Sequence, residues 1–473
     1  LRKDRRRFSS SDFRVAVTTR PCAASLGGQV ARQRRADRLG SCSMRSEEID
    51  KELFVRNRAR LAELLGPGSM VVIHANDIMP TNADGVLPFV QNRDLYYLSG
   101  VDQEETVVIL FPDAEEEKDR EILFVRETSE LISIWEGEKL TKGQAVGVSG
   151  IRQVNWTNSF EAHFHRLMPQ ARAVYLATNE HLRAGVVVET RNVRFIKECQ
   201  ARYPLHDYQR LAPLMDQIRV IKDAEEIKQL QKAIDLTEAG FRRALGFIKP
   251  GVGEWEIEAE YLHEFVRNRS KGFAYPPIVG SGKNACVLHY VENNTICQDG
   301  EMVLMDVGAE WANWNADMTR TVPVNGRFTN RQRDVYNSVL KVQRGSADFL
   351  RPGVTQQEWR DHTIELMEAE LISLGLISAE EAKEQDPEDR HLVKKYYMHG
   401  IGHHLGLDVH DVGNAYEPVK EGMVFTVEPG IYIREESLGV RLEDNILIGR
   451  DGNKNLFENF PVEVEEIEEA MNP

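Results

Sequence analysis

Five residues in the second half of the chain have the types and the surroundings expected of metal ligands. They are two aspartates separated by ten residues, one histidine and two glutamates: Asp306, Asp317, His403, Glu428 and Glu443. Each lies among apolar or glycine-rich neighbours, such as VLMDVG around Asp306, so the sequence predicts that they are buried. Carboxylates are rarely buried unless they are paired or bound to a metal. If all four converge, their charge requires bound cations.

The donor set predicts which ions these would be. Four oxygen donors and one imidazole suit two hard or borderline divalent ions, with Mn²⁺ favoured and Co²⁺, Fe²⁺ or Zn²⁺ as alternatives. The simplest interpretation is a two-metal hydrolase. One carboxylate alone is more often a solvated turn residue or a helix cap, so the hypothesis depends on the joint pattern. A zinc site built only from histidines would leave the four carboxylates unexplained.

Two β-hairpins are expected to bring these ligands together. Strands at 302–307 and 318–322, joined by a turn-like segment at 308–316, would place Asp306 across from Asp317. Strands at 430–433 and 440–446, joined by the charged turn REESLG, would bring Glu428 near Glu443. Two hairpins with two carboxylates each suggest a pseudo-twofold site with the metals between the halves.

The remaining sequence predicts the framework around the hairpins. Residues 44–220 have an α/β pattern, with strands at 69–73, 106–111 and 121–125 and a helix at 191–200. Asp223 is the expected N-cap of a long amphipathic helix, which ends at the Pro-Gly break in KPGVGEWE. Two more helices are expected at 330–349 and 356–374, and the charged run at 378–391 is interpreted as a solvated insertion.

Several segments resemble the aminopeptidase P (Xaa-Pro aminopeptidase) family of metallopeptidases. The C-terminal ones are LHY at 288–290, MDVGAEWANWNADMTRTVPVNG, HGIGHHLGLDVHDVG, EPGIYI and VRLEDN. Upstream, residues 54–73 and 88–110 resemble the N-terminal domain of that family. The resemblance implies an α+β pita-bread catalytic domain at 221–473, preceded by a smaller α/β domain at 44–220. It covers about residues 48–464.

The resemblance also implies a role for each site residue. Asp306 would bind one ion, His403 and Glu428 the other, and Asp317 and Glu443 would bridge them. Glu428 would also shuttle the proton to the prolyl nitrogen of the cleaved Xaa-Pro bond. His410 would hydrogen-bond the scissile carbonyl, and His289 and His399 would contact the substrate around proline. Two further roles are expected from the setting: Arg441 would orient a carboxylate through a bidentate hydrogen bond, and His404 would be structural.

Other functions remain open at this level. Proline dipeptidase is the principal alternative, ahead of methionine aminopeptidase, creatinase and a non-catalytic binding protein of the same fold. The run QNRDLYYLSG favours an aminopeptidase, because it resembles that version of the N-terminal domain. One departure is that some bacterial members have an Arg in the loop after HDVG, where this chain offers only Lys420.

Composition limits the partners and the compartment. The net charge of −16 includes +8 in residues 1–43, so the rest carries −24, which disfavours nucleic acid as a partner. No apolar run is long enough to cross a membrane. Five cysteines without CxxC spacing predict reduced thiols and a cytoplasmic protein. The basic residues 1–43 are expected to be disordered or not native, or an organellar presequence. The expected partners are peptides with proline second, and we also expect a homo-oligomer, either a dimer or a tetramer.

Overall fold

The computed structural model describes residues 49–178, 180–181, 185–386 and 389–472. The prediction for residues 1–43 therefore lies outside the described residues. Residues 49–220 form one lobe around a mixed six-stranded sheet in the order β6-β5-β4-β1-β7-β8. The strands are β1 (Ser69–His74), β4 (Val107–Leu110), β5 (Glu121–Val125), β6 (Gln153–Trp156), β7 (Ala173–Leu176) and β8 (Asp207–Arg210). A separate hairpin consists of β2 (Pro80–Asn82) and β3 (Gly85–Val86).

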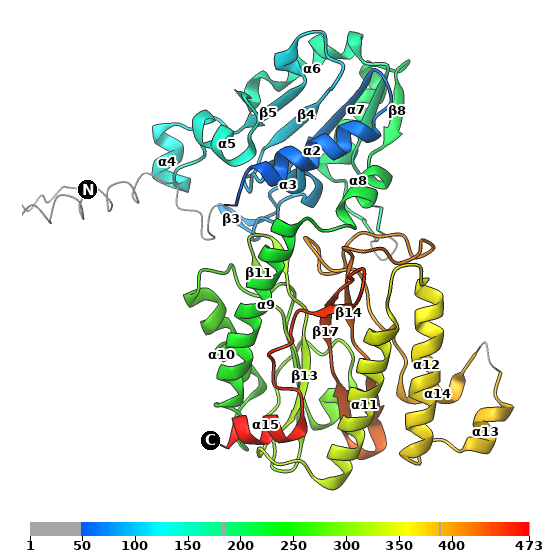
Figure 1. The fold of residues 1–473 in the computed structure, drawn as a ribbon. Coiled ribbons are helices and arrows are strands. Elements are labelled where there is room, and N and C mark those ends of the chain that lie inside the picture. Colours follow the sequence, from blue (N-terminus) through cyan, green and yellow to red (C-terminus); the bar gives the residue numbers. More distant parts are fainter. Residues whose placement is uncertain (1–48, 179, 182–184, 387–388, 473) are drawn as a thin grey trace, which may run out of the picture. The chain divides into compact units, whose positions relative to one another are not determined.

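Helices cover both faces of this sheet (Figure 1). They are α2 (Glu52–Leu64), α3 (Arg93–Ser99), α4 (Glu130–Glu136), α5 (Lys142–Ser149), α6 (Phe160–Leu167), α7 (Arg191–Arg202) and α8 (Ala212–Arg219). All six residues of β1 are buried, which is the pattern of a strand between two helical layers. On one face, Met70 and Val72 pack with Phe164 of α6 and Phe195 of α7. The α/β prediction for this part of the chain is confirmed.

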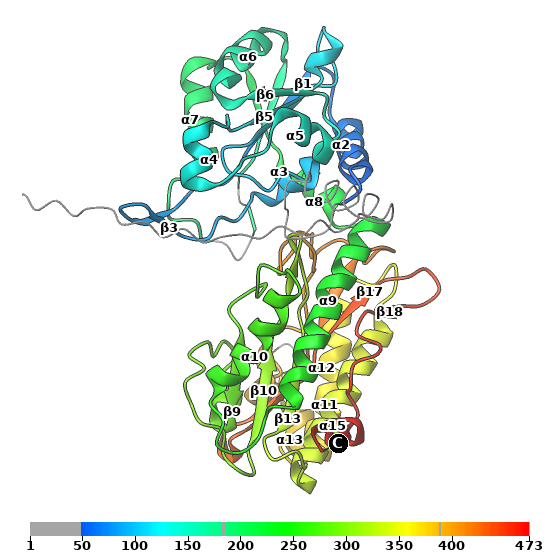
Figure 2. The ribbon, with the colours of Figure 1, turned by 90° about the vertical axis from the view of Figure 1, so that its left-hand side faces the viewer.

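Residues 221–472 form a second lobe of short antiparallel sheets bracketed by helices. Figure 1 shows α9 and α10 on one side of the strands and α11 and α12 on the other, and Figure 2 shows the same lobe from the side of α9 and α10. The helices are α9 (Ala224–Leu245), α10 (Glu254–Arg267), α11 (Asn330–Phe349), α12 (Gln356–Ser373), α13 (Ala379–Glu384), α14 (His391–Tyr396) and α15 (Val464–Met471). As predicted, Asp223 caps α9, accepting a hydrogen bond from Glu225 N at 2.9 Å.

The strands of this lobe form four small sheets. They are β9 (Ile278–Ser281), β10 (Met302–Asp306), β11 (Glu310–Trp311), β12 (Trp314–Asn315), β13 (Thr319–Pro323), β14 (Val424–Val427), β15 (Gly430–Ile433), β16 (Leu438–Arg441), β17 (Asp444–Leu447) and β18 (Lys454–Asn455). The sheets are β13-β10-β9, β14-β17-β18, β11-β12 and β15-β16. Helices and antiparallel strands in this arrangement confirm the predicted α+β class.

Two local predictions need correction. The segment 308–316 is not a simple turn, because it contains the two-stranded β11-β12 sheet. The predicted second hairpin forms, because β15 pairs with β16 across the charged turn. Its second strand, however, ends at Arg441 and not at residue 446, and the following strand β17 pairs with β14 instead. The chain changes partner at residues 442–443, so two pairings, not one, bring Glu428 toward Glu443. The charged run at 378–391 is mostly exposed among its described residues, but it contains α13.

The predicted boundary near residue 220 falls between α8 and α9, where the architecture changes. Contacts nevertheless join the described residues of both lobes into one compact unit. The division into two domains therefore remains an interpretation that rests on the two sheet systems.

Candidate metal centre

The first half of the site is built on the β10-β13 pair. Asp306 ends β10 and lies across from Thr319, the first residue of β13. Asp317 lies two residues before that strand, and its backbone N–H and C=O are both held by the Asn445 side chain, at 3.2 and 2.7 Å. Thr319 in turn accepts the backbone N–H of Glu443 at 3.1 Å and donates its hydroxyl to Glu443 Oε2 at 2.7 Å. These bonds lock Glu443 against the strand that carries the aspartates.

The second half positions His403 and Glu428 through the edge of β14. His403 N donates to Thr426 Oγ1 at 3.0 Å, Thr426 N donates to His403 O at 2.9 Å, and Glu428 N donates to Ile401 O at 2.8 Å. This approach requires Gly402, since a Cβ atom there would lie 2.0 Å from Thr426 O. Gly400 is not constrained in this way, because a Cβ atom there would meet nothing within 4 Å.

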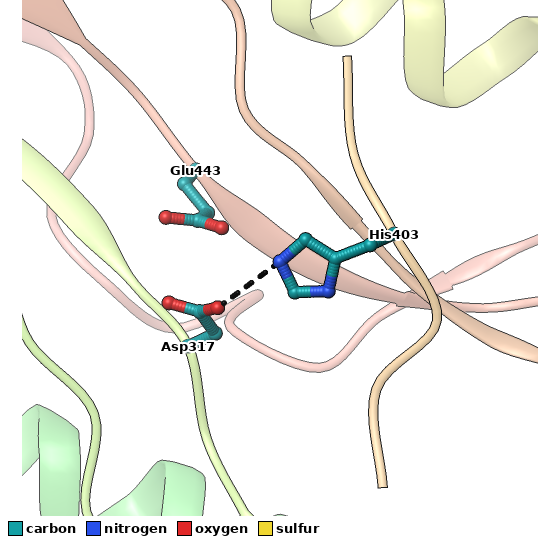
Figure 3. Close-up of side chains that lie close together, drawn as sticks. All are labelled: Asp317, His403 and Glu443. Atoms are coloured by element: carbon teal, nitrogen blue, oxygen red, sulfur yellow. Dashed lines mark ion pairs between the residues drawn. The ribbon is translucent and has the colours of Figure 1, made fainter. Parts of the chain in front are cut away.

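Three candidate ligand atoms of the site lie close to one another. One potential ligand atom each from Asp317, His403 and Glu443 lies within 4.8 Å of the other two, and Figure 3 shows the three side chains pointing toward one another. His403 Nε2 is 3.4 Å from Asp317 Oδ2 and 3.7 Å from Glu428 Oε1. His403 Nδ1 lies 2.9 Å from the carbonyl of His404, so that nitrogen carries the proton and Nε2 presents its lone pair to the carboxylates.

The electrostatics of the cluster call for cations. Burial, reinforced by the neighbouring carboxylates, raises the pKa of Glu428 to about 7 and that of Glu443 well above its ordinary value. Burial also raises the pKa of Asp306, against the opposing effect of Arg441. Burial disfavours a charged His403, yet Asp317 and Glu428 raise its pKa above the usual value. Carboxylates that raise one another's pKa in this way favour a neighbouring cation, which is the behaviour of a metal-ligand set.

Tyr275 is a site residue that the sequence did not reveal. Its hydroxyl lies 2.6 Å from Asp306 Oδ1 and 2.6 Å from Asp317 Oδ1, so it joins Asp306 to the rest of the cluster. A single tyrosine in FAYPPIVG belongs to no spacing pattern that indicates chemistry. Only the fold places it between two aspartates.

Arg441 contacts one carboxylate with one bond, which corrects the expected bidentate geometry. Nη2 donates to Asp306 Oδ2 at 2.5 Å, Nε to Thr319 Oγ1 at 3.1 Å and Nη1 to the Tyr432 hydroxyl at 3.0 Å. The guanidinium therefore ties Asp306 to Thr319, and through that residue to Glu443.

The other histidines surround the cluster at different depths. The exposed His410 packs against His403, with ring centroids 4.3 Å apart and nearly perpendicular planes. His399 is held on both nitrogens, by Gly400 O and by the Tyr432 hydroxyl, each at 2.8 Å. His289 is exposed and close enough to His399 to disfavour its protonation. His404 is buried against Phe425, which fits the predicted structural role.

The donor set fits divalent ions. The carboxylates of Asp317 and Glu443 converge with the His403 imidazole, while Glu428 lies beside His403 and Asp306 is joined to Asp317 through Tyr275. Beside these four carboxylates the described Arg441 leaves an excess of negative charge that bound metal would neutralise. The fold and the site together define a metal-dependent peptidase. Residues 228–450 match metallopeptidase family M24, and residues 54–175 match the aminopeptidase P N-terminal domain.

Individual relatives lead to the same family. The chain is 33% identical to the Xaa-Pro aminopeptidase of Escherichia coli K12, over 90% of this chain and 98% of the relative. Zinc-substituted E. coli aminopeptidase P in complex with product has a TM-score of 0.80 at 32% identity, covering 90% of this chain and 99% of that one. Proline aminopeptidase P II from Yersinia pestis has a TM-score of 0.78 at 31% identity, covering 89% and 99%. The chain belongs to the aminopeptidase P family, and it is a hydrolase.

Two general properties accompany this site. The described cysteines Cys199, Cys286 and Cys297 are buried and form no disulfide. Among the described helices, none is both long and apolar enough to cross a membrane.

Proposed function

We propose that the chain is a two-metal Xaa-Pro aminopeptidase in which the five predicted ligands hold the ions. Asp306 would hold one ion, His403 and Glu428 would hold the other, and Asp317 and Glu443 would contribute to both. The observation that carries this proposal is the convergence of the buried Asp317 and Glu443 with His403. Mn²⁺ is the preferred ion, because oxygen donors dominate the set.

The enzyme hydrolyses the bond between the first residue of a peptide and a proline in second position. When bound, the ions lower the pKa of a water molecule and so supply a nucleophile at neutral pH. Glu428 accepts a proton from that water and passes it to the prolyl nitrogen, which leaves as a secondary amine.

The histidines bind and orient the substrate. His410 lies against His403 and donates a hydrogen bond to the scissile carbonyl as negative charge develops on its oxygen. Burial lowers the pKa of His399 to about 3, so its ring is neutral and flanked by Tyr397 and Tyr432. A neutral ring between two aromatic side chains suits contact with the apolar proline ring. His289 completes the contact with the substrate from the exposed side.

The partners and surroundings follow from the same properties. Peptides with proline second are the substrates, and the acidic body does not bind nucleic acid. Buried free thiols at Cys199, Cys286 and Cys297 suit a reducing, cytoplasmic compartment. A homo-oligomer, dimer or tetramer, stays a prediction.

A matched pair of peptides tests the proposal. Chelated protein resupplied with Mn²⁺, Co²⁺ or Zn²⁺ is incubated with Xaa-Pro-Yaa and with Xaa-Ala-Yaa. Release of the first residue from the proline peptide alone, highest with Mn²⁺, is the expected outcome. Equal cleavage of both peptides would contradict proline specificity, and a higher rate with Zn²⁺ would contradict the choice of metal.

A further inference from the structure

A second cluster of charged side chains lies beside the segment that carries His410. Two buried cations, Arg219 and Lys222, meet three carboxylates, Asp94, Asp408 and Asp411. Arg93 Nε adds a longer contact, 3.5 Å from Asp408 Oδ1. The side chains of Arg219 and Lys222 are only 4% and 1% exposed, and that of Asp411 is 1% exposed. Ions buried to this degree are strongly destabilising unless each has a partner, so the geometry of the cluster is tightly constrained.

Arg219 is the centre of this cluster. Nη1 donates to Asp94 Oδ1 at 2.8 Å, while Nη2 donates to Asp408 Oδ2 at 2.8 Å and to Asp411 Oδ1 at 2.6 Å. Lys222 Nζ donates to the other oxygen of Asp411 at 2.7 Å and to Arg219 O at 2.8 Å. Both oxygens of Asp411 are therefore held by cations, and one guanidinium joins three carboxylates.

Two of these carboxylates flank His410 in the sequence. Asp408 lies two residues before it and Asp411 one residue after it. Asp411 N also donates to His404 O at 2.9 Å, which joins this segment to the neighbour of the ligand His403. Gly406 makes the fit possible, since a Cβ atom there would lie 2.2 Å from Asp411 Oδ2 and 3.0 Å from Lys222 Cε. The backbone on both sides of His410 is thus anchored to Arg219.

The other end of the cluster lies in the N-terminal lobe. Asp94 belongs to the first turn of α3, and Arg219 is the last residue of α8. The carbonyl of Ile218, beside Arg219, accepts the Tyr97 hydroxyl at 3.0 Å and Arg60 Nη2 at 2.7 Å. Helices of residues 49–220 therefore determine where the guanidinium sits.

We propose that Arg219 is a positioning residue for His410: by holding Asp408 and Asp411, it fixes the segment that presents His410 beside His403. The inference rests on the proposed function, because His410 acts on the substrate there. Asp94 extends this arrangement to the N-terminal lobe, which thereby contributes to turnover. A cluster that served stability alone would change the unfolding free energy and leave the turnover of folded enzyme intact.

Two variants each remove some of the ion pairs of the cluster and keep the others. Asp408→Asn is expected to fold, because the Asp408 side chain is 41% exposed and Arg219 keeps its other acceptors. Arg219→Lys keeps the charge and loses the planar fork. In fully metal-loaded enzyme, each should lower kcat on an Xaa-Pro-Yaa peptide by roughly 10- to 100-fold, the cost of a misplaced catalytic group. KM and metal content should stay at the wild-type values.

A double-mutant cycle separates positioning from stability. In a His410→Ala background, Asp408→Asn should lower kcat by less than about twofold, because its effect acts through the missing imidazole. The matched control is Asp119→Asn, which breaks the paired bonds of Arg166 to Asp119 at 2.7 and 2.8 Å on a side chain that is 2% exposed. That control should lower the unfolding midpoint and leave kcat unchanged.

Each contrary outcome is distinguishable. Suppose first that His410→Ala has a low kcat. The inference alone would then be overturned by a wild-type kcat in both Asp408→Asn and Arg219→Lys. It would also be overturned if Asp408→Asn lowered kcat as much in the His410→Ala background as in the wild type, or if Asp119→Asn lowered kcat equally. If His410→Ala keeps the wild-type kcat, the proposed role of His410 fails, and the inference fails with it.

Discussion

At the scale of single residues, Tyr275 shows how the site is organised around its ligands. One hydroxyl proton cannot serve Asp306 and Asp317 at once, although both oxygens lie 2.6 Å away. Burial raises the pKa of Tyr275 well above its ordinary value, so the phenol remains a donor. Groups that hold ligating carboxylates in this way tune metal affinity without touching the metal.

Replacing Tyr275 by Phe should therefore weaken metal binding. The expected loss is about 10- to 100-fold in affinity, with much of the activity recovered at saturating metal. Metal titration of the chelated variant, followed by activity, measures both. Tyr336→Phe is the control, because Tyr336 is also buried and donates its hydroxyl to a backbone carbonyl, Val462 O, at 2.7 Å. Unchanged affinity in Tyr275→Phe would show that the hydroxyl does not orient the ligands.

At the scale of elements, two glycines in the segment before β14 should respond differently to substitution by alanine. Gly402→Ala would place a methyl group 2.0 Å from Thr426 O, whereas Gly400→Ala meets nothing within 4 Å. We expect Gly402→Ala to lose about 1–3 kcal/mol of stability or more, together with metal affinity, because His403 must move with the backbone. Denaturant unfolding and elemental analysis should find Gly400→Ala close to wild type. Equal behaviour of the two variants would contradict the close approach.

Glu226, at the start of α9, should make the free energy of unfolding depend on pH. Glu226 is buried and accepts the Asp223 N–H at 2.9 Å, and burial raises its pKa to about 7. The pKa of Glu226 in the folded protein lies above the unfolded value of about 4.3. The contribution of protonated Glu226 to the free energy of unfolding is therefore fully present below about pH 4.3 and is lost as pH rises through 7. Relative to wild type, Glu226→Gln should gain on the order of 1 kcal/mol of stability per pH unit between pH 5 and 7.

Denaturant unfolding at pH 5, 6, 7 and 8 measures this difference. Glu358→Gln is the control, because Glu358 fills the same capping position in α12 but its hydrogen bonds with Thr355 lower its pKa. The difference in free energy of unfolding between Glu358→Gln and wild type should therefore be constant above pH 5. A constant difference for Glu226→Gln as well would contradict the raised pKa.

The elements also show what could be predicted from sequence. Local patterns predicted the α9 cap and the β10-β13 pairing, because each depends on residues close in the chain. Residue type and apolar surroundings singled out the candidate ligands, of which the fold brings Asp317, His403 and Glu443 together. The exchange of partner at residues 442–443 could not be predicted, since VRLEDNIL continues one alternating pattern across the break. Tyr275 and Arg219 acquire their roles from contacts across 31 to 192 positions, which no local pattern encodes.

At the scale of the whole molecule, the N-terminal lobe distinguishes an aminopeptidase from a proline dipeptidase. We expect Xaa-Pro-Yaa tripeptides and longer chains to be cleaved well and Xaa-Pro dipeptides poorly. The reason is that residues 54–175 match the aminopeptidase P version of the N-terminal domain. Lys420, in the loop after HDVG, is the one departure that counts against this choice, and it is paired with Glu417 at 2.6 Å. Rates measured on matched peptides of two, three and five residues test this. Faster hydrolysis of the dipeptide would make the enzyme a proline dipeptidase.

The account depends most on two ions held by the five predicted ligands. The most direct test is to titrate Mn²⁺ into chelated enzyme and to follow bound metal and Xaa-Pro-Yaa hydrolysis together, in wild type and in Asp317→Ala. We predict that wild type binds two ions per chain and regains activity as they bind, and that Asp317→Ala binds less metal and stays inactive. Turnover in the metal-free wild type, or full metal content and turnover in Asp317→Ala, would contradict the two-metal site.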